Sequence, residues 1–172
     1  MNAGALGAWC WVLMGWAGIL QAQTPNRSLQ VFPNDRLNRM EMICHIEGGV
    51  LRTGADWRGE VLFTLGPSGA IYQGLSRSEL DRPYTVRDNQ LVRGQSSFSD
   101  DILYTWDNDQ VFIGDSRFRL DLVYNLQPVV FQPDVWALYP EDESSPSERR
   151  AVFLGHPTPQ QLFAVLLALG LI

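Results

Sequence analysis

The sequence predicts a mainly β protein made of tandem antiparallel β-hairpins of about twenty residues each, with an apolar segment at the N-terminus and a short apolar helix at the C-terminus. Three observations carry this prediction: an uncharged opening run, a repeat in the middle, and a closing run of apolar residues. The length of 172 residues and the 45% share of hydrophobic residues suit one domain with a substantial core. We expect the following segments: a signal peptide or N-terminal anchor (1–22), an irregular leader (23–40), a β-repeat domain (41–133), a linker (134–156) and a C-terminal apolar helix (157–172).

The N-terminal segment, residues 1–22, has no charged side chain and is almost wholly apolar. An apolar run that ends in small residues is typical of a secretory signal peptide, and cleavage is expected before Gln23. A run of this length can also span a bilayer, so an uncleaved membrane anchor is the alternative. No Arg or Lys precedes the run, whereas Arg27, Arg36 and Arg39 follow it. By the positive-inside rule this order of charges disfavours translocation of the part that follows. The apolar run with its small residues at the end nevertheless favours a location outside the cytoplasm, in the periplasm, at the cell surface or secreted.

A repeat fills the middle of the chain. Sliding the sequence against itself by twenty residues superposes identical residues in four columns. The columns are Gly74, Gly94 and Gly114, preceded by Gly54; Ser76, Ser96 and Ser116; Asp81, Asp101 and Asp121; and Tyr84, Tyr104 and Tyr124. The copies are expected at about 51–70, 71–90, 91–110 and 111–130, and the array is expected to stop where Pro128 and Pro133 would interrupt paired strands.

Each copy has the pattern of two β-strands. An alternating apolar run surrounds the recurring Tyr, a polar turn follows, and a second short apolar run ends the unit. Turn residues such as Asp88 and Asn89 tolerate the αL conformation that a tight hairpin needs. Alternation places the Tyr column on a strongly apolar face that must be covered. Roughly eight to ten such strands form a meander sheet, a closed barrel or a β-solenoid, and the period alone does not choose among them.

The recurring Gly, Ser and Asp residues are expected to shape the connections between strands. The Gly is expected at a positive φ or in a bulge, and the Ser and Asp side chains are expected to bond nearby backbone N–H groups. The same columns also form a repeated surface that can serve in binding.

Cys44 is expected to be a buried, inert thiol. A cleaved chain keeps only this cysteine, so an internal disulfide is excluded. A metal pair with His45 is disfavoured because adjacent strand residues point to opposite faces.

The C-terminal segment contains a helix signal. Residues 140–150 are charged and rich in Ser and Pro, as in a linker. Thr158, Pro159 and Gln161 then form a capping-box pattern, which predicts a helix from Pro159 to about Leu169. Residues 162–172 are all apolar, and about 17 Å of helix is shorter than the roughly 30 Å hydrocarbon core of a bilayer. We expect this helix to dock on the open apolar face of the repeat sheet; membrane contact or self-association is the alternative.

No catalytic motif is present in the sequence. His45 and His156 are far apart, and the recurring Gly-x-Ser lacks the context of a nucleophile elbow. The repeated Asp residues match no known calcium loop. The net charge of −6 disfavours nucleic acid as a partner. We therefore expect no enzyme activity, no cofactor and no metal site, and an envelope hydrolase is the least favoured function.

The repeat resembles that of a loose group of short, exported, uncharacterised bacterial proteins with tandem copies of an Ile-Tyr-x-Gly-x-Ser…Asp-Ile-Leu-Tyr-Thr pattern. The resemblance covers residues 50–126 and is best at residues 101–105 and 114–116. It implies a β-hairpin repeat fold and transfers no catalytic residue. The function expected is a structural or binding, adhesive module of the cell envelope with an unidentified surface partner. The alternative is a carrier of a small apolar ligand, if the repeats close into a barrel.

Overall fold

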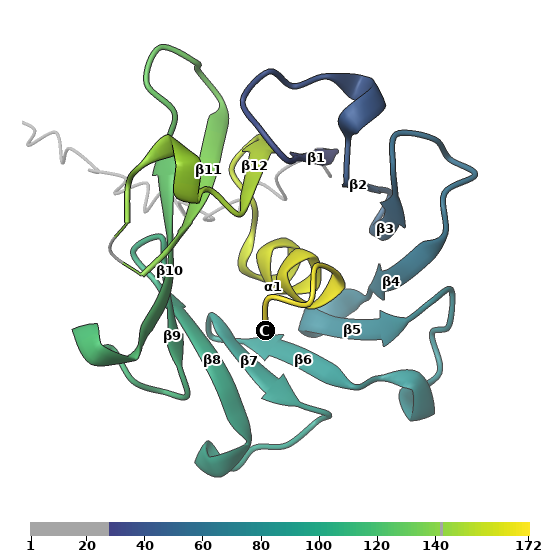
Figure 1. The fold of residues 1–172 in the computed structure, drawn as a ribbon. Helices are drawn as coiled ribbons and strands as arrows, with labels where there is room; N and C mark the ends of the chain where they lie inside the picture. The colour runs from purple at the N-terminus through teal and green to yellow at the C-terminus, as the bar shows by residue number, and fades with distance from the viewer. Residues whose placement is uncertain (1–27, 142) are drawn as a thin grey trace, which may run out of the picture.

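The computed structural model describes residues 28–141 and 143–172. The predicted signal peptide or anchor, residues 1–22, lies outside the described residues. Twelve antiparallel strands form a closed barrel around one α-helix (Figure 1). The strands are β1 (Leu29–Phe32), β2 (Cys44–Glu47), β3 (Val50–Thr53), β4 (Val61–Leu65), β5 (Ala70–Gln73), β6 (Tyr84–Arg87), β7 (Gln90–Arg93), β8 (Ile102–Asp107), β9 (Gln110–Ile113), β10 (Leu122–Pro128), β11 (Val135–Pro140) and β12 (Ala151–Leu154).

Every strand pairs with its neighbours in sequence, and the first strand pairs with the last. Val31 in β1 lies opposite Phe153 in β12, and this pairing closes the barrel. The twelve strands are thus five hairpins and a sixth pair, β12 with β1, which joins the two ends of the sheet. The predicted class, mainly β with antiparallel hairpins, is confirmed, and the closed barrel is the alternative that the chain adopts.

Three predictions about the segments are wrong. The array does not stop at Pro128, because β10 runs through Pro128 and pairs with β11, with Leu126 opposite Leu138. Residues 134–156, predicted to be a linker, contain β11, the 3-10 helix η6 (Pro146–Glu148) and β12. Residues 23–40, predicted to be an irregular leader, contain β1. Pro128 is the last residue of its strand, where a missing N–H costs little.

The interior of the barrel is filled by helix α1 (Pro159–Ala168). The helix begins where the sequence predicted, because the Thr158 hydroxyl accepts from the backbone of Gln161 and the Gln161 side chain accepts from the backbone of Thr158. Its residues from Leu162 to Leu166 are fully buried. They belong to one hydrophobic cluster with the inward-facing residues of successive strands, among them Leu51, Ile71, Leu91 and Val111.

The expected docking position of the helix needs one correction. The sheet has no open apolar face, because it closes on itself, and the helix lies inside it (Figure 1). Among residues 28–141 and 143–172, no helix combines the length and the apolarity needed to cross a membrane.

The antiparallel order places the links between strands alternately at the two ends of the barrel. One end, here called the turn rim, has the tight links 48–49, 66–69, 88–89, 108–109 and 129–134, of which 66–69 includes the 3-10 helix η2 (Pro67–Gly69). The other end, the connector rim, has six longer connectors: 33–43, 54–60, 74–83, 94–101, 114–121 and 141–150. Five of these contain a 3-10 helix: η1 (Arg39–Glu41), η3 (Glu79–Asp81), η4 (Ser99–Asp101), η5 (Arg119–Asp121) and η6. The connectors reach outward from the barrel (Figure 1).

Candidate functional site: the connector rim

The recurring glycines begin four of the connectors. Gly54, Gly74, Gly94 and Gly114 have φ values of 65°, 61°, 59° and 65°, in the left-handed region that favours glycine. The N–H of Gly74 donates to the carbonyl of Leu62 (3.0 Å), and the other three glycines donate in the same way. The glycine column therefore sets the direction in which each connector leaves its strand.

The recurring Ser and Asp residues hold each connector closed. The Ser76 hydroxyl donates to the Asp81 carboxylate (2.6 Å), and its oxygen accepts from the N–H of Ser78 (3.0 Å). The copies at Ser96 and Ser116 make the same pair of bonds, to Asp101 and Asp121 and from the N–H two residues further on. These bonds use both the donor and an acceptor of each hydroxyl.

A column of threonines, one residue after the recurring aromatic, ties the connectors to the barrel. Thr64 and Thr105 donate to the carbonyls of Gly74 (2.6 Å) and Gly114 (2.7 Å), and Thr85 donates to Gly94. The copy before them has a histidine instead: His45 Nδ1 lies 2.7 Å from the carbonyl oxygen of Gly54. His45 thus occupies a structural position of the repeat.

Cys44 lies on the inner side of the barrel, in the cluster around the helix. Burial raises the pKa of its thiol to about 12, so the thiol form dominates at neutral pH. In the described part of the chain, no group of three or more His, Cys, Asp and Glu side chains is placed to hold a metal ion.

The Tyr column lies inside the barrel and not at the connector rim. Tyr84 and Tyr104 pack against the cluster around the helix, and the Tyr124 hydroxyl donates to the carbonyl of Leu171 (3.0 Å). Burial raises the pKa of Tyr124. The structure therefore brings the Gly, Ser and Asp columns together in the connectors and separates the Tyr column from them.

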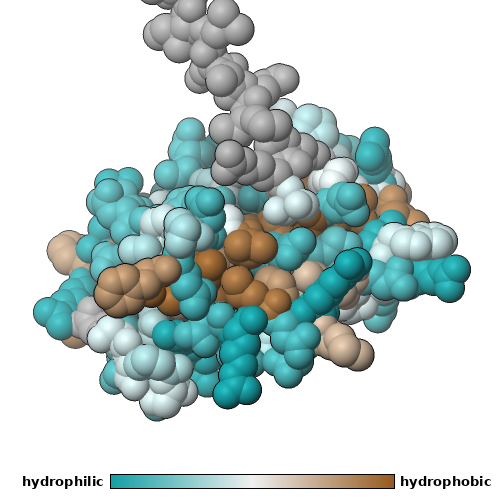
Figure 2. All heavy atoms as spheres, turned by 90° about the horizontal axis from the view of Figure 1, so that it is seen from above, coloured by the Kyte–Doolittle hydropathy of each residue, from teal (hydrophilic) through white to brown (hydrophobic). Residues whose placement is uncertain are grey.

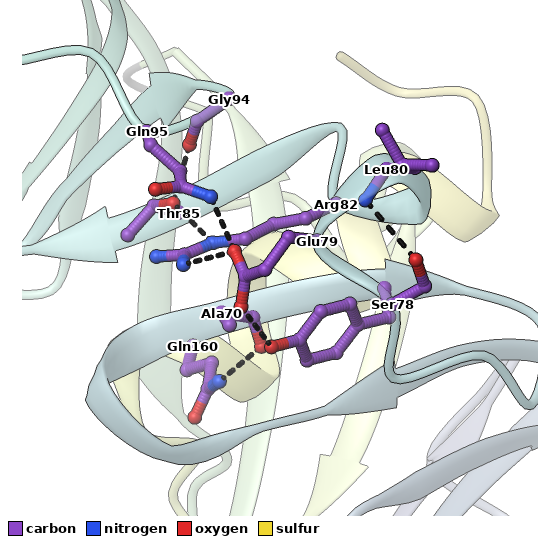
Figure 3. A network of polar contacts seen from close by, with 10 residues as sticks. Ala70, Ser78, Glu79, Leu80, Arg82, Thr85, Gly94, Gln95 and Gln160 are labelled. Atoms are coloured by element: carbon purple, nitrogen blue, oxygen red, sulfur yellow. Dashed lines mark hydrogen bonds and ion pairs between the residues drawn. The ribbon is translucent and has the colours of Figure 1, made fainter.

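A polar network fixes connector 74–83 to the next hairpin (Figure 3). The Glu79 carboxylate accepts from Arg82 (2.9 Å), from the Tyr72 hydroxyl (3.1 Å) and from Gln95. The Arg82 guanidinium also donates to Thr85 (3.0 Å). The hydrogen bond from Arg82 lowers the pKa of Glu79, whereas desolvation raises the pKa of Tyr72. This connector is therefore held at several points along its length.

An ion pair joins the first and last connectors. The Arg149 guanidinium lies 2.8 Å from the Asp35 carboxylate and donates to the Tyr139 hydroxyl (3.0 Å). The hydrogen bond from Arg149 lowers the pKa of Asp35. The pair links connectors that are far apart in sequence and flank the closing strand pair of β12 with β1.

The tips of these well-held connectors carry large apolar side chains that face solvent. Met40, Leu80 and Leu120 are the middle residues of their 3-10 helices, and they are 95%, 96% and 98% exposed. Further exposed apolar residues of the same rim are Trp57, Leu75, Phe98 and Phe118. In the side view of Figure 2, single apolar side chains stand at the outline of the molecule. Sequence reasoning missed this set, although the same sliding comparison pairs Phe98 with Phe118.

Comparison with known proteins gives one family. The model of a family described as "6-fold beta flower protein" matches residues 31–132, from β1 to just beyond β10. No curated protein and no solved structure matches the chain significantly.

Proposed function

The chain belongs to the 6-fold beta flower protein family, and from this premise we propose that it is a non-enzymatic binding module of the cell envelope whose connector rim contacts the partner. The six strand pairs of the barrel, five hairpins and the closing pair of β12 with β1, are consistent with the six-fold description of the family. The finer proposal depends on one observation: repeated connectors present nearly fully exposed apolar side chains.

The stability of the barrel does not explain why these exposed side chains are apolar. A residue that is 96% exposed, such as Leu80, contributes almost no apolar burial to the barrel. Burying one such leucine against a partner would contribute about 1.5–3 kcal/mol before the costs of association. Met40, Leu80 and Leu120 stand at equivalent places, so contacts of one kind can add across several connectors.

The rigidity of the connectors supports a role in binding. The hydrogen bonds of Ser76 and Asp81, and those of the Glu79 network, fix the backbone on which Leu80 stands. A connector whose backbone is held in place before binding loses less entropy on association than a mobile loop does.

The non-enzymatic part of the proposal is supported by the use of the polar groups. The recurring serines donate to an Asp and accept from the backbone, so each hydroxyl is engaged in holding its loop. Location in the envelope is supported by the apolar run in residues 1–22. The carrier alternative has less support, because α1 lies where an apolar ligand would lie.

Retention on the envelope tests the proposal. The double variant Leu80→Ser/Leu120→Ser is compared with Phe131→Ser, which removes an equally exposed aromatic (99%) from the opposite rim. We expect purified wild-type protein and the control to sediment with envelope fragments of the producing cells, and the double variant to stay in the supernatant. Equal sedimentation of the double variant and the wild type would refute the role of the connector rim.

A further inference from the structure

A second surface, at the opposite end of the barrel, has the form of a binding cavity. The cavity has a volume of about 1140 Å³, and each of the five tight links of the turn rim contributes to its lining. The segment that leads from β12 into α1, residues 155–161, also lines it. Small-molecule pockets commonly have volumes of about 300–1,000 Å³, so this one is large enough for an extended ligand.

An aromatic group forms part of the cavity wall. The His156 ring stacks on Trp106 with a centroid distance of 5.7 Å, and it meets Trp136 edge-on at 4.4 Å. His156 Nε2 lies 2.9 Å from the Asp109 carboxylate. These contacts hold the segment that crosses the mouth of the barrel against hairpin β8–β9, so the wall is built before any ligand arrives.

Polar side chains stand around the same mouth without partners. Within the described residues, the amides of Asn89 and Asn108 and the carboxylate of Asp134 make no hydrogen bond. Gln160 donates through its amide to the carbonyl of Ala70 (2.8 Å, Figure 3) and to that of Gly66 (3.0 Å). This leaves the side-chain oxygen of Gln160 as an acceptor. The mouth therefore offers both donors and acceptors.

The charge of the lining narrows the ligand class. The lining includes Asp109 and Asp134 and no arginine, so it repels anionic groups such as phosphates and carboxylates. The N-terminus of α1 is satisfied by its own capping box and is not left open for an anion. The donors and acceptors of the cavity can bond the hydroxyl groups of a sugar, and the apolar ring surface beside them can contact the C–H face of a sugar ring.

We propose that the turn-rim cavity binds an uncharged saccharide, with Asn89 and Asn108 bonding its hydroxyls and the half-exposed His156 ring, which is backed by the buried Trp106, contacting its apolar face. This site is separate from the connector rim and does not depend on the function proposed for that rim. Sugar binding at one end and partner contact at the other can thus occur on one molecule.

The turn geometry supplies a clean variant. Asn89 and Asn108 have φ values of 64° and 50°, and Gly48 and Gly49 occupy the same kind of link in hairpin β2–β3. Asn89→Gly/Asn108→Gly therefore removes both amides and keeps a backbone that glycine readily adopts. Asp88→Gly is the matched control, because Asp88 lies in the same turn at a φ of 50° and does not line the cavity. Asn89→Asp/Asn108→Asp is a second variant, which keeps the turn preference, removes the donors and adds two negative charges.

The test is calorimetric titration of the protein with maltotriose, with tri-N-acetylchitotriose and with spermidine. We expect at least one trisaccharide to bind, Asp88→Gly to bind equally well, and the double glycine variant to bind about tenfold more weakly or worse. The aspartate variant is expected to lose affinity as well. Binding of neither sugar, binding of spermidine alone, or unchanged sugar affinity in both double variants would overturn the proposal.

Discussion

The packing of helix α1 inside the barrel makes a sharp prediction about two neighbouring leucines. Leu166 is fully buried and Leu167 is only partly buried, although both stand in the same helix. Leu166→Ala and Leu167→Ala thus change helix propensity equally and differ in the burial of the side chain that is removed. A buried Leu→Ala change costs about 3–5 kcal/mol, from lost transfer free energy and the cavity left behind, and the change at the partly buried Leu167 is expected to cost about 1–2 kcal/mol.

Urea unfolding measures this difference. With a slope of about 2 kcal/mol/M for a domain of this size, Leu166→Ala is expected to lower the unfolding midpoint by roughly 1.5–2.5 M. Labelling of Cys44 provides a second probe, because its thiol is 1% exposed and its pKa is raised to about 12, so the thiol should react with a disulfide reagent only on unfolding. Equal midpoints for the two variants would mean that α1 does not lie in the core of the barrel.

Two further predictions concern single contacts. Asp35→Asn should remove up to about 1 kcal/mol of stability at neutral pH, because the ion pair with Arg149 is partly exposed. The pKa of Asp35 is lowered in the folded state, so this contribution to stability is present above the unfolded pKa and disappears as pH falls through the folded pKa. A difference in the free energy of unfolding between wild type and Asp35→Asn that grew in acid would contradict the role of the ion pair. Thr105→Val should cost about 1–2 kcal/mol, because the carbonyl of Gly114 loses its donor, and Thr64→Val should cost a similar amount; thermal unfolding of the two variants would check the equivalence of the copies.

Much of the repeat could be predicted from sequence because its signals are local. The αL glycines, the Asp and Asn turns and the capping box of Thr158 and Gln161 each depend on residues within a few positions of one another. Alternation along a strand likewise placed the Tyr column on the apolar face. Physical preferences of this kind act before the chain is folded.

Closure of the barrel could not be predicted in this way. It depends on the pairing of β1 with β12, between residues such as Val31 and Phe153 that are far apart in sequence. The last hairpins also lack the recurring residues: Glu141, with a φ of 45°, stands after β11 where earlier copies have glycine. Without that signal, Pro128 and Pro133 indicate an end of the array that the pairing of β10 with β11 contradicts.

The candidate sites were predicted only in part. The Ser and Asp columns indicated the connectors, because their hydrogen bonds are local. The exposed leucines were missed, since a leucine in a repeat is normally interpreted as core. The cavity at the turn rim was missed for a different reason, because five separate turns and the segment around His156 assemble it.

The most direct test of the central claim is a graded series of connector variants, measured for affinity to isolated envelope fragments: Leu80→Ser, then Leu80→Ser/Leu120→Ser, then the triple variant with Met40→Ser. If the exposed tips act together, each substitution lowers the apparent affinity by a similar factor, and the triple variant binds no better than background while Phe131→Ser binds as wild type. An affinity that does not change along the series, or that falls equally in Phe131→Ser, would contradict the claim that the connector rim is the binding surface.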